Sequence, residues 1–294
     1  MSQAIEALSA HFQHPGLEFQ LGSGGFVKAV VNTEVSTGEV YLHGAHVTAF
    51  QLNGQPPLLW MSERSLFETG KAIRGGVPIC FPWFGPLASD PKAPGHGFAR
   101  VKVWDIATAY PSDDGGLAID LQTTIDDYTL TYTVAFGRTL QLTLKVDLSP
   151  SASGLAKFEE ALHTYLSVSD VRNVTIEGLE STGFVDKVDG GKRKPATGES
   201  IRFSSECDRV YLDTTATCVL RDPGFNRSIA VSKSASRSTV VWNPWIEKSI
   251  KMADFGDNEW PTMLCIETAN VGSNSIELEP GQSHTLTAQV AVLT

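Results

Sequence analysis

Hydrophobic and polar residues alternate strictly along two neighbouring segments, "TLTYTVAF" at 129–136 and "LQLTLKVDL" at 140–148. The side chains of a β-strand point alternately to its two faces, so each segment presents one apolar face. The two segments are separated by a short turn at Gly137-Arg138. Together they predict an antiparallel hairpin.

The same alternation recurs elsewhere in the chain. The segment "SIELEPGQSHTLTAQVAVL" at 275–293 predicts a second hairpin with its turn at Pro280-Gly281. Segments 38–52 and 218–233 also have the pattern of strand pairs. Only 1–10 and 62–70 are candidates for short helices.

Turn-forming residues are dense, since the chain has 26 Gly and 15 Pro among its 294 residues. Many short strands with regular turns predict an all-β sandwich of mostly antiparallel strands. No proline-rich linker or charge block divides the chain. We therefore expect one β-sandwich domain over residues 1–294, with no functional motif in 1–37. No repeat of fixed length occurs, which argues against a propeller.

The net charge of −10 argues against nucleic acid or an anionic membrane as the main partner. The start of the chain lacks a basic segment followed by an apolar one, so we expect no signal peptide. No run approaches the roughly 20 apolar residues of a membrane span. The cysteines form no C-x-x-C pair and are expected to be buried thiols of a cytoplasmic protein, not disulfides or zinc ligands. They are Cys80, Cys207, Cys218 and Cys265.

One acidic residue stands out in the segment "TMLCIETAN" at 262–270. In a strand, Glu267 shares a face with the apolar residues Met263 and Cys265. A carboxylate on a core-like face is costly unless it is paired or used in chemistry.

Two glycine-rich segments carry candidate ligand-binding residues. Arg74 precedes two glycines in "AIRGGVPICFPWFGP", and its planar guanidinium suits phosphate or carboxylate. The aromatic residues of this segment are candidates for the floor of a sugar pocket. The alternative is a structural loop whose arginine meets a protein carboxylate. His96 and Arg100 lie in "PGHGFAR", where a solvated turn histidine is the simpler reading. The aromatic residues are Phe81, Trp83 and Phe84.

Polar side chains in later strands extend this set. His163 shares a strand face with Tyr165 and can hold a proton near neutral pH, although this stretch alone favours a surface histidine. Asp208 can accept hydrogen bonds from sugar hydroxyls, or pair with Arg209 or Arg172. Trp242 and Trp245 can stack on sugar rings or pack in the core. His43 and His46 would face opposite sides of a strand, which argues against a metal site.

Taken together and in order, several of these blocks resemble the glucose-6-phosphate 1-epimerase family, the hexose-phosphate mutarotases related to aldose 1-epimerase. The resemblance runs from about Gly38 to the end of the chain. One departure is His284, which stands where a tryptophan is expected. The matching blocks are "IRGGVPICFPWFG", "PGHGFAR", "LHTYLSVSD", "DRVYL", "VVWNPWIEKSIKMADFGDNEW" and "MLCIETAN".

This resemblance implies a galactose-mutarotase-like β-supersandwich, no cofactor, and interconversion of the α and β anomers of a hexose 6-phosphate, most simply glucose 6-phosphate. It implies His163 as general acid and Glu267 as general base. Arg74, His96 and Arg100 are the implied substrate or phosphate contacts, and Asp208 is the implied contact to a sugar hydroxyl. A small sugar phosphate is then the partner, and the expected oligomeric state is a monomer.

Two other classes of function compete with this reading. A non-catalytic carbohydrate-binding sandwich would use the tryptophans and Asp208 but would not need a proton donor opposite a base. A glycoside hydrolase usually needs two carboxylates that flank the scissile bond, and Asp208 with Glu267 would be the pair. Release of reducing sugar from a glycoside would identify the hydrolase.

Overall fold

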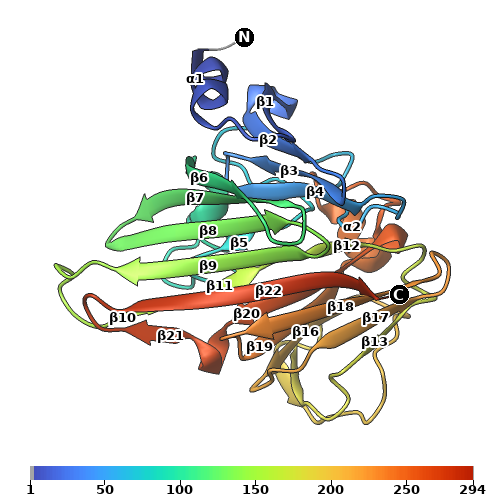
Figure 1. The fold of residues 1–294 in the computed structure, drawn as a ribbon. Helices are drawn as coiled ribbons and strands as arrows, with labels where there is room; N and C mark the ends of the chain where they lie inside the picture. Colours follow the sequence, from blue (N-terminus) through green and yellow to red (C-terminus); the bar gives the residue numbers. More distant parts are fainter. Residues whose placement is uncertain (1–2, 294) are drawn as a thin grey trace.

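The computed structural model describes residues 3–293, and most of them lie in β-strands. Within this range the helices are α1 (Gln3–His11) and α2 (Trp245–Lys251). The predicted all-β class with few short helices is confirmed (Figure 1). Short 3₁₀ turns are also present: η1 (Ser23–Gly25), η2 (Ala99–Val101), η3 (Trp260–Thr262) and η4 (Gly272–Asn274).

One eight-stranded antiparallel sheet, here sheet I, contains the hairpin that the alternating pattern predicts. Leu130, Tyr132, Val134 and Phe136 are fully buried in it, because the apolar face of their strand packs on the core. The strands of sheet I run in the order β13 (Thr175–Glu177), β17 (Cys218–Asp222), β18 (Arg227–Ser234), β22 (Ser283–Leu293), β9 (Leu140–Leu148), β8 (Tyr128–Phe136), β7 (Leu117–Ile125) and β6 (Asp105–Pro111).

A second eight-stranded sheet, sheet II, is built around β20 (Met263–Asn270), in which every residue is buried. A strand covered on both faces is predominantly apolar, as most of this one is. The strands run in the order β15 (Lys192–Lys194), β14 (Phe184–Asp186), β16 (Cys207–Leu212), β19 (Ser238–Asn243), β20, β11 (Glu160–Leu162) and β5 (Ile79–Cys80), with β12 (Tyr165–Ser167) also paired to β20.

Two smaller antiparallel sheets complete the fold. A four-stranded sheet contains β1 (Leu17–Leu21), β2 (Val27–Asn32), β3 (Ser36–Tyr41) and β4 (His46–Leu52) in that order. A two-stranded sheet pairs β10 (Ala156–Phe158) with β21 (Ile276–Leu278).

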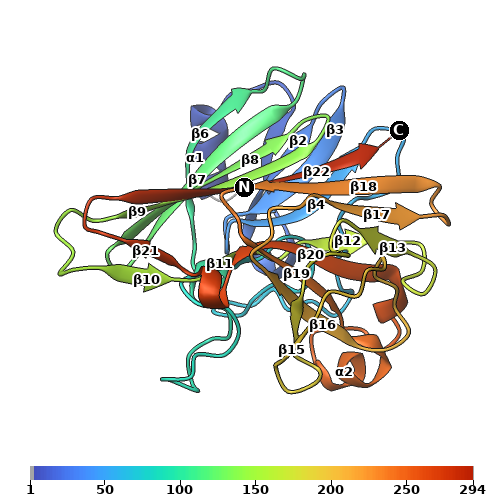
Figure 2. The ribbon, with the colours of Figure 1, turned by 90° about the horizontal axis from the view of Figure 1, so that it is seen from below.

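Sheets I and II are stacked, and α2 lies on the side of sheet II that faces away from sheet I (Figure 2). One large apolar cluster includes residues of both sheets, among them Leu142 and Ile266. A smaller cluster, with Cys80, Ala161 and Val240, belongs to sheet II. Sheet II therefore has a packed face toward sheet I and a second face on which side chains from α2 meet those of the strands.

Two local predictions need correction. The segment 275–293 forms two strands as expected, but β21 pairs with β10 and not with β22, whose partners are β9 and β18. Residues 62–70 contain no helix; they form turns and irregular backbone. The predicted helix at 1–10 is found as α1, and its first two residues lie outside the described range.

Other expectations can be read from the same structure. The four cysteines are buried free thiols, as predicted. His284 pairs with the buried carboxyl of Glu160, with Nε2 2.9 Å from Oε1. The polar residue in place of the expected tryptophan therefore has a specific partner. Within residues 3–293, neither helix is long and apolar enough to cross a bilayer.

Candidate active site

Glu267 lies in the middle of β20, where Val240 of β19 is its neighbour on one side. On the other side, the pairing of β20 passes from Leu162 in β11 to Tyr165 in β12. His163 occupies this interruption, and its backbone N–H donates to the carbonyl of Pro78. The break in the ladder thus brings the imidazole to the carboxyl, with Nε2 3.4 Å from Oε1.

Both members of this pair are removed from water. Glu267 is 1% exposed and His163 is 7% exposed. The interpretation of His163 as a surface histidine is therefore wrong. Burial raises the pKa of Glu267 well above its usual value, and the charge of Asp208 adds to this, while Arg100 opposes it. Burial, together with His96, Arg100 and Arg74, lowers the pKa of His163 well below its usual value.

The two pKa shifts favour a neutral carboxyl on Glu267 and a neutral imidazole on His163. A neutral carboxyl and a neutral imidazole hold one proton between them, as do a carboxylate and an imidazolium. Because the groups are in near contact, the proton belongs to the pair. Among the described residues, Glu267 Oε2 and His163 Nδ1 are buried without a hydrogen-bond partner. The pair therefore retains unused hydrogen-bonding capacity.

The pair opens into a cavity of about 560 Å³, which is large enough for a monosaccharide phosphate. Its wall comes from sheet II, from α2 and the residues after it, and from the loops around 84–96. The lining residues are Arg74, Phe84, Gly85, Pro86, His96, His163, Lys187, Asp208, Val240, Trp242, Lys248, Met252 and Glu267.

Arg74 combines the two readings that its sequence left open. It lines the cavity, and its guanidinium pairs with the Asp254 carboxylate, with Nη2 3.0 Å from Oδ2. Its Nη1 donates to the Tyr165 hydroxyl at 2.8 Å. The glycines after it serve the backbone: a Cβ on Gly76, whose φ is +56°, would lie 2.1 Å from the Val47 carbonyl oxygen. The positive charge of Arg74 is thus already compensated by Asp254 before a ligand binds.

His96 lies in the cavity wall, its ring 5.7 Å from that of His163. Its Nδ1 accepts a hydrogen bond from the Gly85 N–H at 3.3 Å, so the ring hydrogen is on Nε2. Burial lowers its pKa, and the charges of Arg100 and Arg74 lower it further. A neutral His96 with a fixed tautomer can donate one hydrogen bond.

Arg100 is not among the residues that line the cavity. Its Nη2 donates to the Gly95 carbonyl at 2.6 Å. Its charge nevertheless acts on Glu267, His163 and His96, lowering the pKa of each. In this structure Arg100 supplies an electrostatic field behind the site, and its predicted contact with substrate stays a prediction.

Asp208 lines the cavity from β16, near two lysines. The Lys248 Nζ of α2 lies 3.6 Å from Asp208 Oδ2 and 2.7 Å from Glu206 Oε1. Asp208 therefore pairs with neither Arg209 nor Arg172. Burial raises the pKa of Asp208, and Lys248 and Lys187 oppose that shift. A carboxylate beside an ammonium group offers a sugar diol one acceptor and one donor.

Of the predicted aromatic floor, Phe84 lines the cavity and Phe81 and Trp83 do not; of the two tryptophans expected to stack on sugar rings, Trp242 lines it and Trp245 does not. Phe81 instead packs against Phe158 in the core, and Trp245 packs on Trp260 with ring centroids 4.2 Å apart. Tyr165 stacks on His163 at 4.8 Å, so a ring supports the imidazole from one side.

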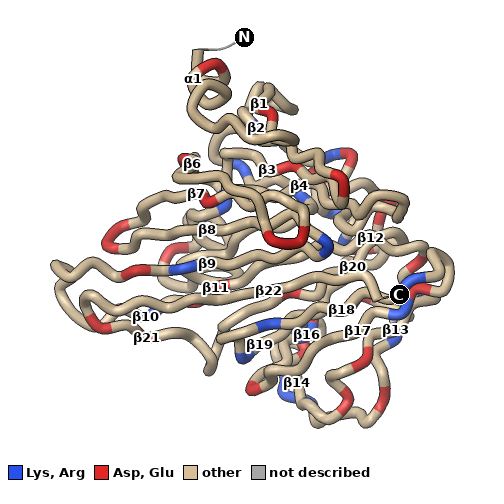
Figure 3. Tube along the Cα trace, viewed as in Figure 1, with Lys and Arg blue, Asp and Glu red and all other residues tan. Residues whose placement is uncertain are grey.

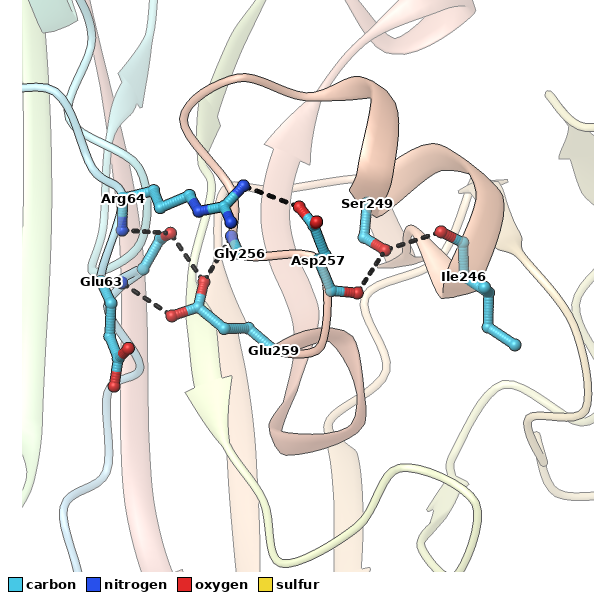
Figure 4. Close-up of polar contacts among 8 residues, drawn as sticks. Glu63, Arg64, Ile246, Ser249, Gly256, Asp257 and Glu259 are labelled. Atoms are coloured by element: carbon cyan, nitrogen blue, oxygen red, sulfur yellow. Dashed lines mark hydrogen bonds and ion pairs between the residues drawn. The ribbon is translucent and has the colours of Figure 1, made fainter.

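The segment after α2 is fastened to the chain near residue 63 (Figure 4). The Glu259 carboxylate accepts hydrogen bonds from the backbone N–H of Glu63 and of Gly256. Arg64 pairs with Asp257 at 2.7 Å. Asp254, the partner of Arg74, lies in this segment. The Glu259 contacts help to hold this segment beside the cavity wall, whereas the Arg64–Asp257 pair is solvent-exposed.

Sequence reasoning missed Lys187, Lys248, Met252 and Asp254. The motif block containing α2 held the last three, but nothing local distinguished them from surface residues. Asp254 is 180 positions from Arg74, and such a pairing has no signal in one sequence. The same block also contains Glu247, Asp257 and Glu259, so acidity alone does not single out Asp254.

The raised pKa of Glu267 predicts a stability effect that depends on pH. The folded chain keeps a proton on Glu267 above pH 4.5, where the unfolded chain has released it, so this group makes stability fall as pH rises. Glutamine cannot lose that proton. We therefore expect Glu267→Gln to gain stability relative to wild type between pH 5 and pH 8, by about 1.4 kcal/mol for each unit of pKa shift.

Urea unfolding of both proteins at the two pH values measures this gain. The lowered pKa of His163 works in the opposite direction, making stability rise up to about pH 6.5. This effect of His163 is present in both proteins, so it largely cancels in the difference between their free energies of unfolding. If the two proteins differ in free energy of unfolding by the same amount at pH 5 and at pH 8, folding does not raise the pKa of Glu267.

Comparison with known proteins gives a consistent result. The aldose 1-epimerase family profile matches residues 30–291. A "putative glucose-6-phosphate 1-epimerase" of Escherichia coli strain K12 is 36% identical over 236 residues, which cover 78% of each chain. A relative with the same description from Cenchrus ciliaris is 34% identical over 259 residues, covering 83% of this chain and 78% of the relative.

Solved structures agree with the architecture. The crystal structure of a "putative mutarotase" from Salmonella typhimurium has a TM-score of 0.88 and 30% identity, covering 96% of this chain and 95% of that one. A galactose mutarotase-like protein from Lactobacillus casei, at 15% identity, has a TM-score of 0.68 over 90% of this chain and 99% of its own. The predicted galactose-mutarotase-like β-sandwich is confirmed.

Proposed function

Because this chain belongs to the aldose 1-epimerase family, we propose that it interconverts the α and β anomers of a hexose 6-phosphate, with glucose 6-phosphate as the expected substrate. One observation carries the proposal: a buried carboxyl and a buried imidazole, 3.4 Å apart, open into a sugar-sized cavity. A binding module has no need of such a proton-carrying pair.

The chemistry of anomer exchange needs one base and one acid. Glu267 as carboxylate takes the proton of the C1 hydroxyl, and protonated His163 gives a proton to the ring oxygen. The bond between C1 and the ring oxygen breaks, leaving an open-chain aldehyde. After rotation about the C1–C2 bond, the same transfers run in reverse and close the ring on the other face. Each positioned proton transfer typically contributes roughly 10²–10⁴-fold.

The protonation of the pair suits this cycle. The cycle begins with the proton on His163. After ring opening the proton is on Glu267, and ring closure returns it to His163. The total number of protons on the pair is unchanged, so neither group must exchange with water between steps. Burial, which raises the pKa of Glu267 and lowers that of His163, stabilises the state with the proton on Glu267, which is the state from which ring closure starts.

The remaining lining residues are proposed substrate contacts. His96 donates through Nε2, Asp208 accepts from a sugar hydroxyl, and Arg74 donates from the N–H groups that its protein partners leave free. Arg100, which is not among the lining residues, is retained as a proposed contact. Phe84 and Trp242 cover apolar ring faces.

We also propose that the chain works as one domain, as a monomer, in the cytoplasm. The large apolar cluster extends from Ile5 in α1 to Val290 in β22, which supports one folding unit. Free buried cysteines suit a reducing compartment.

Polarimetry tests the proposed reaction. Freshly dissolved α-glucose 6-phosphate is expected to reach its equilibrium rotation faster with the protein than in buffer alone, in proportion to protein concentration. The same trace with glucose measures the preference for the phosphate. Identical traces with and without protein, for both sugars, would rule the reaction out.

Arg74→Ala is expected to lower kcat/KM for glucose 6-phosphate. The change removes charged donors and leaves the Asp254 carboxylate unpaired beside the cavity. A hydrogen bond to a charged group contributes about 1.5–3 kcal/mol, which corresponds to roughly a ten- to hundredfold loss. The initial polarimetric rate at several substrate concentrations measures it.

The matched control is Arg64→Ala. Arg64 also pairs with an aspartate of the segment after α2, Asp257 (Figure 4), and it is not among the residues that line the cavity. Its loss is expected to leave kcat/KM unchanged. Equal losses in the two variants would mean that Arg74 acts through the loop and not on the ligand.

A further inference from the structure

Lys187 has no role in the mechanism above, yet it lines the cavity together with Glu267 and His163. It follows β14 at the start of the turn toward β15, and it is exposed. The reacting pair is at the buried end of the cavity, with Glu267 only 1% exposed. Lys187 therefore lies at the solvent-exposed end of the cavity, here called its mouth.

The three cationic residues of the cavity wall differ in how their charge is compensated. Arg74 pairs with Asp254 at 3.0 Å, and Lys248 pairs with Glu206 at 2.7 Å. Among residues 3–293, no carboxylate oxygen lies within 4.0 Å of the Lys187 Nζ. Lys187 attracts Asp208 only at longer range. An incoming anion would find at Lys187 the cationic group that the protein has not already neutralised.

The backbone holds Lys187 at this place. Its N–H donates to the carbonyl of Asp208 at 2.8 Å, which extends the pairing of β14 with β16. The Asp186 side chain accepts hydrogen bonds from the N–H groups of Val188 and Asp189 and so caps the turn. The Lys187 side chain is exposed, and it begins at a backbone position that this hydrogen bond fixes beside Asp208.

The surrounding charges favour an anion at this end. Residues 184–194 carry four cationic and two acidic side chains, on a chain whose net charge is −10. Basic positions are visible beside β14 and β16 in Figure 3. A local excess of positive charge on an acidic protein attracts small anions to one place and raises their rate of association.

We propose that Lys187 binds the phosphate of the substrate at the mouth of the cavity and supplies the preference for phosphorylated over unphosphorylated sugars. This inference rests on the proposed function. The anomeric carbon must reach Glu267 and His163 at the buried end. The phosphate is the most strongly hydrated part of the substrate, and at the mouth it keeps part of its water while gaining a charge-assisted hydrogen bond.

Lys187→Met tests this assignment, because methionine keeps the apolar stem and removes the charge. We expect kcat/KM for glucose 6-phosphate to fall about tenfold, the lower end of what a hydrogen bond to a charged group contributes, since the site is exposed. We expect kcat/KM for glucose to stay unchanged. Lys187→Arg should restore most of the preference.

The control is Lys192→Met. Lys192 is on the same hairpin, pairs with Asp189 at 2.8 Å and lies outside the cavity, so its loss should leave kcat/KM for glucose unchanged and lower that for glucose 6-phosphate far less than the loss of Lys187 does. If Lys187→Met leaves the ratio of the two kcat/KM values as in wild type, or lowers both equally, the assignment is wrong while the proposed reaction stands. If the wild type accelerates neither sugar, the proposed reaction itself fails.

Discussion

Replacing Glu267 with glutamine is expected to lower the protein-dependent rate of anomer exchange by about 10²–10⁴-fold, the usual contribution of a positioned proton transfer. Glutamine has nearly the same shape, but it cannot take the proton of the C1 hydroxyl. No other carboxylate can substitute directly, because Asp208 pairs with Lys248 and belongs to a different strand. Polarimetry with glucose 6-phosphate, corrected for the buffer rate, measures the loss.

The chain offers a matched control for this variant in Glu160. Like Glu267, it is fully buried, contacts a histidine, and has one oxygen without a partner among the described residues. It lies outside the cavity. Glu160→Gln is therefore expected to leave the rate unchanged. Activity in Glu267→Gln within a few-fold of wild type would remove Glu267 as the base.

His163→Asn is expected to lower the same rate by about 10²–10⁴-fold, because asparagine cannot give a proton to the ring oxygen. The loss should not add fully to that of Glu267→Gln, since the two residues act in one step. Sugar binding, followed by the change in tryptophan fluorescence at Trp242, should persist. His284→Asn, which alters the other buried glutamate–histidine pair, is the control.

This variant also separates the proposed enzyme from a carbohydrate-binding sandwich. In a binding module there would be no catalysed exchange to lose, with or without His163. In the proposed enzyme, binding survives and exchange is lost. A variant that retains the full exchange rate would show that the ring oxygen receives its proton from another group.

The parts of the fold that the sequence predicts well are those set by local alternation. The strands at 129–136 and 140–148 pair as the expected antiparallel hairpin because one face of each is wholly apolar. The strand at 276–278 also forms, but it pairs with β10, because both sides of β22 are taken by β9 and β18. Strand pairing is decided by the whole sheet, and the spacing around Pro280-Gly281 does not reveal it.

The candidate site shows the same division. Glu267 could be singled out from its own strand, because a carboxylate on an apolar face needs an explanation. His163 was expected at the surface on local grounds, and only the break between β11 and β12 explains why it is buried beside Glu267. Lys187 and Asp254 have no local signal, since their roles depend on residues far away in the chain.

The compensation of Arg74 by Asp254 has a further meaning for the site. An arginine whose charge is already balanced gives a ligand hydrogen bonds but little net attraction. Preference for a phosphate then has to come from another cation, and Lys187 is the described cationic residue of the cavity wall that lacks a carboxylate partner within 4.0 Å. The acid–base pair and the phosphate contact would thus be separate parts of one cavity.

The most direct test of the central claim is proton exchange spectroscopy on glucose 6-phosphate at anomeric equilibrium. With wild type, cross-peaks between the α and β anomeric protons should grow with protein concentration. With Glu267→Gln and with His163→Asn, they should fall to the level of buffer, while Glu160→Gln behaves as wild type. Cross-peaks that do not change when wild-type protein is added, or that persist in both site variants, would contradict the assignment of this cavity to anomer exchange.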